Sequence, residues 1–258
     1  MGEELLTRDA LFNGRLVCTQ FKRGYRFSAD AVLAAHFCRP AAGDLILDLG
    51  CGSGIIGLIL AFRHPGARVT GLEVQEELAR LARENFRSNG LESRASVIHG
   101  SLREITTLVA PESFDLVVSN PPYRKPGSGR LSPTDQRARA RHEIDASLSE
   151  VARAASFALK NRGRAVFVYP ATRLMSLAAA LQRVRLEPKR LQPVYSYPGS
   201  PKATLVLVEA LKNGGEEVQL LDPFYIHARQ NGPYSDAIQT LYDCQTPTFC
   251  GTEAGKPC

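Results

Sequence analysis

The sequence predicts a doubly wound α/β fold built on a mostly parallel sheet. From residue 45 onward, short apolar runs rich in branched residues alternate with segments of helical periodicity. This alternation is typical of strands that helices bury on both faces. A glycine-rich stretch at 47–57 follows the first run, and the tetrad Asn-Pro-Pro-Tyr at 120–123 follows the fourth. Both loops therefore fall at the carboxyl edge of the sheet, where open α/β sheets bind ligands.

The individual elements follow from local signals along the chain. Asn13-Gly14 between apolar neighbours predicts a β-hairpin around 11–17. Ser28 before an apolar helical pattern predicts the start of a helix that ends before Pro40. The same reasoning predicts strands at 45–49, 69–74, 95–99, 114–119, 164–169, 191–195 and 204–211. Helices are expected near 54–63, 75–89, 144–160 and 171–184.

The chain divides into three parts by composition and pattern. We expect a hairpin and helix at 1–43 packed on the core, the main α/β domain at 44–243, and a flexible tail at 244–258. A length of 258 residues with 44% hydrophobic side chains suffices for one large core. The chain shows neither a signal-peptide pattern nor about 18 consecutive apolar residues, and its six cysteines show no C-x-x-C spacing. We therefore expect a cytoplasmic protein with reduced thiols.

Net charge is a weak guide to the partner. Thirty-two Lys and Arg against 26 Asp and Glu give a net charge of +6. That excess would attract a polyanion such as RNA, but it also fits a solvated surface rich in arginine.

The glycine-rich stretch has the residue types of a nucleoside-binding loop. Gly50, Gly52 and Gly54 would allow a tight turn and a close approach of the backbone to a ligand. Gly57 would allow the following helix to pack closely on a strand. The spacing also fits the dinucleotide fingerprint, so the glycines alone do not distinguish between the two kinds of cofactor.

Two carboxylates favour S-adenosyl-L-methionine over a dinucleotide. Asp48 stands two residues before Gly50 at the end of the strand, where it could receive the methionyl ammonium group but would repel a pyrophosphate. Glu73 ends the next strand, where it could accept hydrogen bonds from both ribose hydroxyls of either cofactor. The structural alternatives are a loop-capping carboxylate for Asp48 and a solvated strand end for Glu73. Both residues at these offsets favour the cofactor.

The Asn-Pro-Pro-Tyr tetrad suits methyl transfer to a planar nitrogen. The side-chain oxygen of Asn120 and the backbone carbonyl of Pro121 can each accept one hydrogen of an amine whose lone pair is delocalised. Pro121 and Pro122 stiffen the loop without adding a competing N–H. Tyr123 offers a ring on which a base can stack, worth about 1–3 kcal/mol. Such a transfer needs alignment and no metal. Alternatively, Pro-Pro only ends the strand and Tyr123 covers its edge.

With these residues, the chain resembles class I S-adenosyl-L-methionine-dependent methyltransferases, and more narrowly the bacterial tRNA(Val) adenine-37 N6-methyltransferase family. The resemblance covers roughly residues 10–240. It runs through the hairpin, the 24–34 segment, the glycine-rich loop and the tetrad, and its most specific parts are the 26–30 segment and the triplet 141–143. It implies a seven-stranded sheet whose last strand, near 204–211, is antiparallel.

The resemblance also implies further contacts to the cofactor. The segment from Arg26 through Ser28 to Asp30 would line the site, although Ser28 could simply cap a helix. Ser101 stands where the family usually has an acidic residue near the cofactor adenine. A serine hydroxyl can still make a hydrogen bond there.

The long loop at 124–143 carries candidate contacts to RNA. Its arginines could grip phosphates around a displaced base or form a solvated surface; they are Arg130, Arg137, Arg139 and Arg141. His142 invites a catalytic interpretation, but a histidine beside Glu143 at a helix start is more often structural.

The leading hypothesis is methylation of the N6 amino group of an adenine in tRNA. Protein-glutamine N5-methylation uses the same tetrad, but such enzymes usually carry an extra helical domain, and only about 44 residues precede the first strand here. Guanine N2-methylation of rRNA stays open. A DNA adenine methyltransferase would need a larger target-reading insertion. A catalytically silent RNA-binding module is disfavoured by the intact tetrad.

Overall fold

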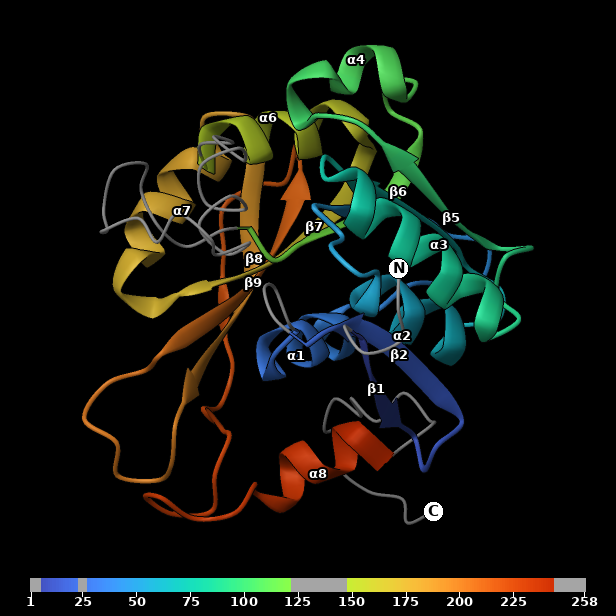
Figure 1. Ribbon diagram of the computed structural model, residues 1–258. Coiled ribbons are helices and arrows are strands. Elements are labelled where there is room, and N and C mark those ends of the chain that lie inside the picture. The colour runs from blue at the N-terminus through green and yellow to red at the C-terminus, as the bar shows by residue number, and fades with distance from the viewer. Residues whose placement is uncertain (1–5, 23–26, 122–147, 244–258) are drawn as a thin grey trace, which may run out of the picture.

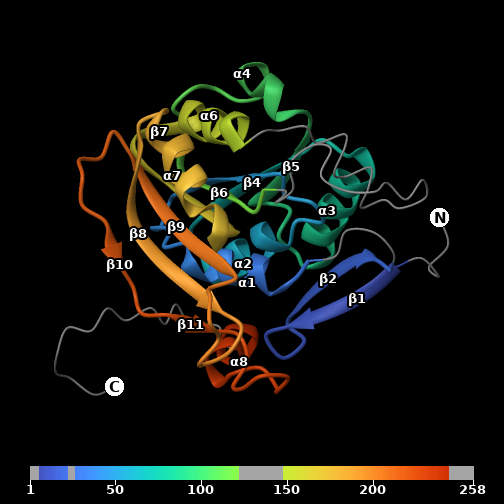
Figure 2. The same cartoon turned by 90° about the vertical axis from the view of Figure 1, so that its left-hand side faces the viewer.

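The computed structural model describes residues 6–22, 27–121 and 148–243, which form a sheet with helices on both faces and a separate hairpin (Figure 1). The hairpin consists of β1 (Leu6–Leu11) and β2 (Leu16–Phe21). It lies at one side of the molecule, beside α2 and α3 (Figure 2). The doubly wound α/β fold is confirmed.

The main sheet follows the predicted order of strands along the chain. Its long strands are β3 (Leu45–Leu49), β4 (Arg68–Glu73), β5 (Ala95–His99), β6 (Phe114–Ser119), β7 (Leu159–Pro170), β8 (Leu186–Tyr195) and β9 (Leu205–Lys212). They lie side by side in the order β5-β4-β3-β6-β7-β9-β8. The strand β9 pairs antiparallel with both β7 and β8, as the resemblance implies. The strand order reverses between β3 and β6, which is where open α/β sheets bind ligands.

Helices cover both faces of this sheet. One face carries α1 (Ala29–Phe37), α2 (Ile55–Arg63) and α3 (Glu76–Ser88), and the other carries α4 (Ile105–Leu108), α6 (Leu148–Ala158) and α7 (Leu174–Gln182). Successive strand residues point to opposite faces. Ile46 therefore packs with α1 and α2, and Leu47 packs with α6 and α7. In the described parts of the chain, no helix is both long and apolar enough to cross a bilayer.

Several predicted boundaries are wrong. The predicted helix at 144–160 ends earlier, at Ala158, because β7 begins at Leu159, and its start at 144–147 lies outside the described residues. The strand β8 begins at Leu186, five residues before the predicted start. The prediction missed these residues because the charged side chains near Pro188 obscure the apolar pattern. The predicted helix at 171–184 is a 3-10 turn followed by α7.

Short elements escaped prediction altogether. They are the 3-10 turn at Leu102–Glu104, α4, the two-residue strands β10 (Gln219–Leu220) and β11 (Phe224–Tyr225), and α8 (Asp236–Asp243). Both short strands pair with the outer edge of β8 and bring the described sheet to nine strands, two more than the seven that the resemblance implies. The chain then reaches the hairpin, where the Phe12 backbone N–H donates to the Tyr242 carbonyl at 2.6 Å.

Three cysteines of the described chain are buried thiols: Cys18, Cys38 and Cys51. Burial raises the pKa of Cys38 and Cys51, and the charge of Asp48 adds to the effect. A thiol that stays protonated is a poor nucleophile. These three cysteines serve as packing residues.

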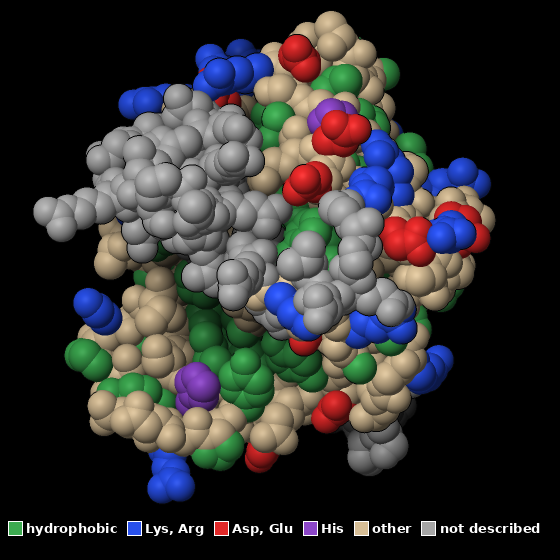
Figure 3. All heavy atoms as spheres, viewed as in Figure 1, with side chains coloured by type: hydrophobic (Ala, Val, Ile, Leu, Met, Phe, Trp, Pro, Cys, Tyr) green, Lys and Arg blue, Asp and Glu red, His purple; other side chains and the backbone are tan. Residues whose placement is uncertain are grey.

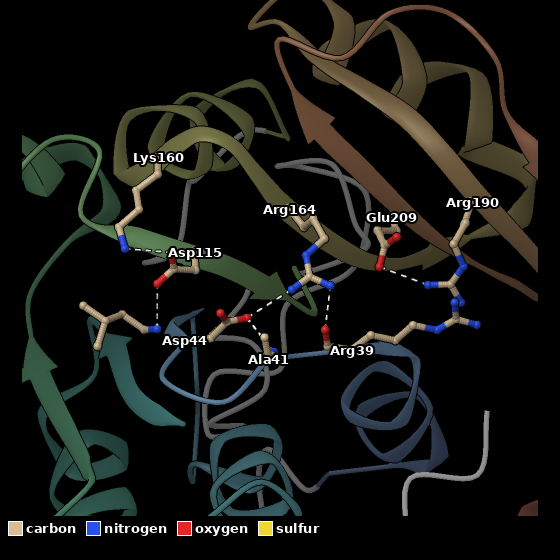
Figure 4. Close-up of polar contacts among 9 residues, drawn as sticks. Arg39, Ala41, Asp44, Asp115, Lys160, Arg164, Arg190 and Glu209 are labelled. Carbon is tan, nitrogen blue, oxygen red and sulfur yellow. Dashed lines mark hydrogen bonds and ion pairs between the residues drawn. The ribbon is translucent and has the colours of Figure 1, made fainter. Parts of the chain in front are cut away.

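Ion pairs tie together the amino-terminal ends of the parallel strands (Figure 4). Arg164 of β7 contacts Asp44 at 3.0 Å and the backbone carbonyl of Arg39. Asp115 of β6 accepts from the Leu45 backbone N–H at 2.9 Å and pairs with Lys160 at 2.7 Å. These contacts join the strand starts at the edge opposite their carboxyl ends.

A further ion pair lies deeper on the same side of the structure (Figure 4). Arg190 of β8 pairs with Glu209 of β9 at 3.0 Å, and both side chains are buried. The Arg190 guanidinium also lies 4.3 Å from the centre of the Phe37 ring. Because a cation over an aromatic face is attracted to it, this contact fastens α1 to the β8–β9 pair.

Two asparagines of α3 attach the hairpin to the rest of the molecule. Asn85 pairs with the backbone N–H and carbonyl of Thr19, both at 2.8 Å. Asn89 pairs in the same way with Val17, at 2.9 and 2.8 Å. Residues four apart rise about 6 Å along a helix. That rise nearly matches the roughly 6.8 Å between alternate residues of a strand, so the side chains substitute for a neighbouring strand.

We predict that Asn85→Ala lowers the free energy of unfolding by about 2–4 kcal/mol, because it leaves the partly buried backbone groups of Thr19 and the buried carbonyl of Ser53 without their partner. Urea unfolding followed by circular dichroism measures the change. The control Asn161→Ala removes an exposed amide and should stay within about 0.5 kcal/mol of the parent protein. Equal effects of the two substitutions would contradict the prediction.

Candidate active site

The loop after β3 is held against β4 by backbone hydrogen bonds. The N–H groups of Gly50 and Cys51 both donate to the Leu72 carbonyl, at 2.8 and 3.1 Å. Gly50, Gly52 and Gly54 have φ angles of 74°, 57° and 84°. Glycine adopts this left-handed region without the steric cost that other residues meet. The prediction that these glycines form a tight turn is confirmed.

The surroundings of the loop are open at Gly50 and closely packed at Gly57. A Cβ atom on Gly50 would have none of the described neighbours within 4 Å. A Cβ atom on Gly57 would lie 3.0 Å from the Phe86 ring and 3.2 Å from Val69. The predicted close packing of helix on strand at Gly57 is therefore confirmed.

Glu73 lies at the carboxyl end of β4 and faces the loop. Its Oε2 accepts from the Gly52 N–H and its Oε1 from the Gln75 N–H, both at 2.9 Å. Burial raises the pKa of Glu73, and these backbone donors partly offset the shift. The side chain is only 3% exposed, which rules out a solvated strand end. Since each carboxylate oxygen has two lone pairs, both can still accept a hydroxyl.

Asp48 is a buried carboxylate on the face of β3 that packs against α1 and α2. It is 1% exposed, and neither oxygen has a hydrogen-bond partner among the described residues. Burial raises its pKa to about 7, and the charge of Glu73 adds to the rise. The nearby Gly57 backbone amide, outside hydrogen-bond geometry, partly opposes it. An isolated buried carboxylate is costly, so the position suits a cationic partner.

Asn120 and Pro121 follow β6 at the same edge. The Ser119 hydroxyl donates to the Leu49 carbonyl at 2.8 Å, which joins the ends of β6 and β3. The Asn120 amide nitrogen donates to Asp30 Oδ2 at 3.3 Å. Pro121 is buried, and the other two members of the tetrad, Pro122 and Tyr123, lie outside the described residues.

The strand register explains why these side chains meet. Leu49 pairs with Leu72 of β4 and with Ser119 of β6, so the three strands end at one level. Asp48, Glu73 and Asn120 therefore occupy one edge of the sheet, although 72 positions separate the first from the last. The face that carries α1 is hollowed between that helix and the β8–β9 pair, and hydrophobic side chains line the hollow (Figure 3).

Comparison with known proteins identifies the fold and the family. The model of the methyltransferase small domain matches residues 27–172, more than half of the chain. The chain belongs to this family. A Porphyromonas gingivalis W83 protein named tRNA1(Val) (adenine(37)-N6)-methyltransferase is 35% identical over 179 residues, covering 67% of this chain and 69% of the relative. A relative of the same name from Bacteroides fragilis YCH46 is 30% identical over 222 residues, covering 86% and 92%.

Solved structures support the same fold. A predicted O-methyltransferase from Agrobacterium tumefaciens superposes with a TM-score of 0.68 and 21% identity, covering 84% of this chain and 97% of that one. TYW2 of Pyrococcus horikoshii, solved in complex with MeSAdo, gives a TM-score of 0.57 at 15% identity, covering 83% and 74%. Together with the family match and the named relatives, this fold confirms the resemblance to S-adenosyl-L-methionine-dependent methyltransferases, and the chain is such an enzyme.

The residues at the sheet edge fit S-adenosyl-L-methionine. Asp48 would hold the methionyl ammonium group, because its buried oxygens lack a counterion among the described residues. Glu73 would accept the ribose hydroxyls, and the Gly50 loop leaves room for the backbone to approach the nucleoside. Bound there, the cofactor would supply an electrophilic methyl group on a positively charged sulfur.

The other predicted cofactor contacts are only partly described. Ser28 precedes α1 as expected, but its hydroxyl donates to Asp30 and does not cap the helix. Ser101 begins the next 3-10 turn, where its Oγ accepts from the Arg103 N–H at 3.2 Å. The neighbouring Gly100 N–H donates to the Glu73 carbonyl at 3.0 Å, which places Ser101 beside the site. Arg26 lies outside the described residues.

Other predicted residues also lie outside the described chain: Arg130, Arg137, Arg139, Arg141, His142 and Glu143. The sequence prediction also assigned no individual role to Asp30. A carboxylate in the first turn of a helix is an ordinary feature, and the sequence did not predict its contact with Asn120.

We predict that cofactor binding releases protons at pH 6. At that pH Asp48 is mostly protonated in the cofactor-free enzyme, and pairing with the ammonium group would ionise it. Affinity should rise as the pH increases through about 7. Calorimetry in two buffers of different ionisation enthalpy measures the release. Asp48→Asn should abolish the proton release, whereas the exposed control Glu92→Gln should not. Proton release that persists in Asp48→Asn would contradict the role of Asp48 as the partner of the ammonium group.

We also predict how Asp48 affects the stability of the cofactor-free enzyme. Its pKa rises from an ordinary 3.8 to about 7 on folding, so the folded state holds a proton that the unfolded state has already lost. Its contribution to stability is full below pH 3.8 and is lost as the pH rises through 7. Urea unfolding should show this loss in the parent protein and a smaller one in Asp48→Asn. Identical pH profiles would refute it.

Proposed function

We propose that this methyltransferase adds a methyl group to the N6 amino group of an adenine in tRNA. The relatives that match it over most of their length carry the name of that activity. The observation that supports the chemistry is the placement of Asn120 at the sheet edge beside Asp48 and Glu73. Amide and carbonyl acceptors there suit a conjugated amine, which needs its hydrogens held while the nitrogen becomes tetrahedral.

In this proposal, two neighbouring acceptors hold the amine. Asn120 Oδ1 accepts one hydrogen and the Pro121 carbonyl accepts the other, so the nitrogen lone pair is turned toward the methyl group. Asp48 holds the methionyl ammonium group of the cofactor and Glu73 holds its ribose. Together they align the methyl group with that nitrogen. Because the reacting groups are aligned before reaction, most of the rate enhancement comes from positioning.

The remaining contacts to RNA stay predictions from the sequence. Tyr123 would stack on the target base, and Pro122 would stiffen the loop that carries it. The predicted phosphate contacts are Arg130, Arg137, Arg139 and Arg141. A cytoplasmic location and the division into parts at 1–43, 44–243 and 244–258 also remain predictions.

A labelling experiment tests the substrate. The enzyme is incubated with S-adenosyl-L-methionine labelled in the methyl group and with total tRNA, rRNA or a release factor. The product is then digested to nucleosides or amino acids. We expect label in N6-methyladenosine from tRNA. Label in glutamine of the release factor alone, or in N2-methylguanosine of rRNA alone, would overturn the proposal.

Asn120→Ala tests the role of the amide. Loss of a fixed acceptor that acts on the developing charge should lower turnover by about 100-fold or more. Cofactor affinity, measured by calorimetry, should change little because the amide is assigned to the target amine. Asn161→Ala, which truncates an exposed asparagine, is the matched control. Turnover within twofold of the parent enzyme in Asn120→Ala would refute the assigned role.

A further inference from the structure

The amide of Asn120 is contacted by a residue 90 positions earlier in the chain. Asp30 lies in the first turn of α1, which packs against β6 and β7. Its Oδ2 accepts a hydrogen bond from Asn120 Nδ2 at 3.3 Å. The contact therefore links the start of a helix to the residue that follows β6.

Asp30 is itself held in place by its own helix. Its Oδ1 accepts from the Ala31 N–H at 3.2 Å and from the Ser28 hydroxyl. The positive end of the helix dipole also stabilises a carboxylate in the first turn. With Oδ1 engaged by these local donors, Oδ2 is the oxygen directed at Asn120.

We propose that Asp30 is a positioning residue that determines which end of the Asn120 amide faces the target nitrogen. An ionised carboxylate can only accept hydrogen bonds, so it pairs with the NH₂ end of an amide and repels the oxygen end. Asn120 Oδ1 is thereby turned away from Asp30. The inference rests on the proposed function, in which that oxygen accepts a hydrogen of the target amine.

The opposite orientation of the amide would be unproductive. It would direct two N–H donors at the hydrogens of the amine and place Oδ1 against the carboxylate. Asp30 also carries a negative charge that polarises the amide and makes Oδ1 a better acceptor. Since the target nitrogen gains positive charge during transfer, this effect is larger in the transition state than in the substrate complex.

Asp30→Asn separates this role from simple packing. The substitution keeps the shape of the side chain, but an amide can donate as well as accept and no longer selects one orientation of Asn120. We expect kcat to fall by about 10- to 100-fold. KM for tRNA and Kd for S-adenosyl-L-methionine should change by less than about threefold, because the residue acts on the transition state.

Two further variants make the test specific. Asp236→Asn makes the same change at an exposed carboxylate in the first turn of α8 and should leave kcat unchanged. Asp30→Glu retains an acceptor-only group and should recover part of the activity that Asp30→Asn loses. If Asp30→Asn lowers the melting temperature, kcat of Asp30→Asn and kcat of Asp30→Glu are both measured at a temperature below the unfolding transitions of the two variants.

A double-mutant cycle under single-turnover conditions isolates the coupling. If Asp30 acts through Asn120, then Asp30→Asn should cause no further loss in an Asn120→Ala background. Additive losses in the double mutant would overturn the inference. An unchanged kcat in Asp30→Asn would also overturn it, as would a loss of activity in Asp30→Asn that weakened cofactor affinity explains completely. Retained turnover in Asn120→Ala alone would instead overturn the role of Asn120 in the proposed function.

Discussion

The parallel register of β4, β3 and β6 is the constraint on which the site depends. Each strand contributes one polar residue within one position of its carboxyl end: Glu73, Asp48 and Asn120. The backbone pairing of Leu49 with Leu72 and Ser119 sets the relative height of these side chains. A slip of one strand would move its polar residue away from the other two, so the hydrophobic core that determines the register also determines the chemistry.

The two edges of the sheet differ in how their polar groups are satisfied. At the amino-terminal edge, Arg164 and Lys160 pair with Asp44 and Asp115, so these four charges are satisfied by protein contacts. At the carboxyl edge, Asp48 is buried without a hydrogen-bond partner among the described residues. Departures of this kind are expected at functional sites, where the ligand supplies what the protein lacks. The cofactor would therefore complete the structure as well as take part in the reaction.

Local sequence patterns predicted much of this arrangement. The bounds of β3, β5 and β6 agree with the structure, because their apolar runs are bordered by clear polar or glycine residues. The glycines of the loop were predictable for a different reason, because a turn that needs positive φ angles favours glycine. The superfamily was predicted from the glycine-rich loop and the tetrad at 120–123, and the narrower family from the 26–30 segment and the triplet 141–143.

Other features depend on contacts between distant segments and could not be predicted. The strands β10 and β11 have two residues each, too few for a periodic pattern. The start of β8 carries polar residues, and they precede Arg190, where β10 begins to pair with the outer side of β8. The contact of Asp30 with Asn120 joins positions 90 apart, and neither residue type is unusual where it stands. Only the packing of α1 on β6 brings them together.

The two asparagines of α3 also determine how β2 can associate with other chains. An open strand edge presents unpaired N–H and carbonyl groups on which a strand of another molecule can form. In β2, those groups of Val17 and Thr19 are occupied by Asn89 and Asn85. The hairpin is therefore protected on that side from strand addition, even though it lies outside the main sheet. Its attachment to the helix thus also guards the enzyme against edge-to-edge aggregation.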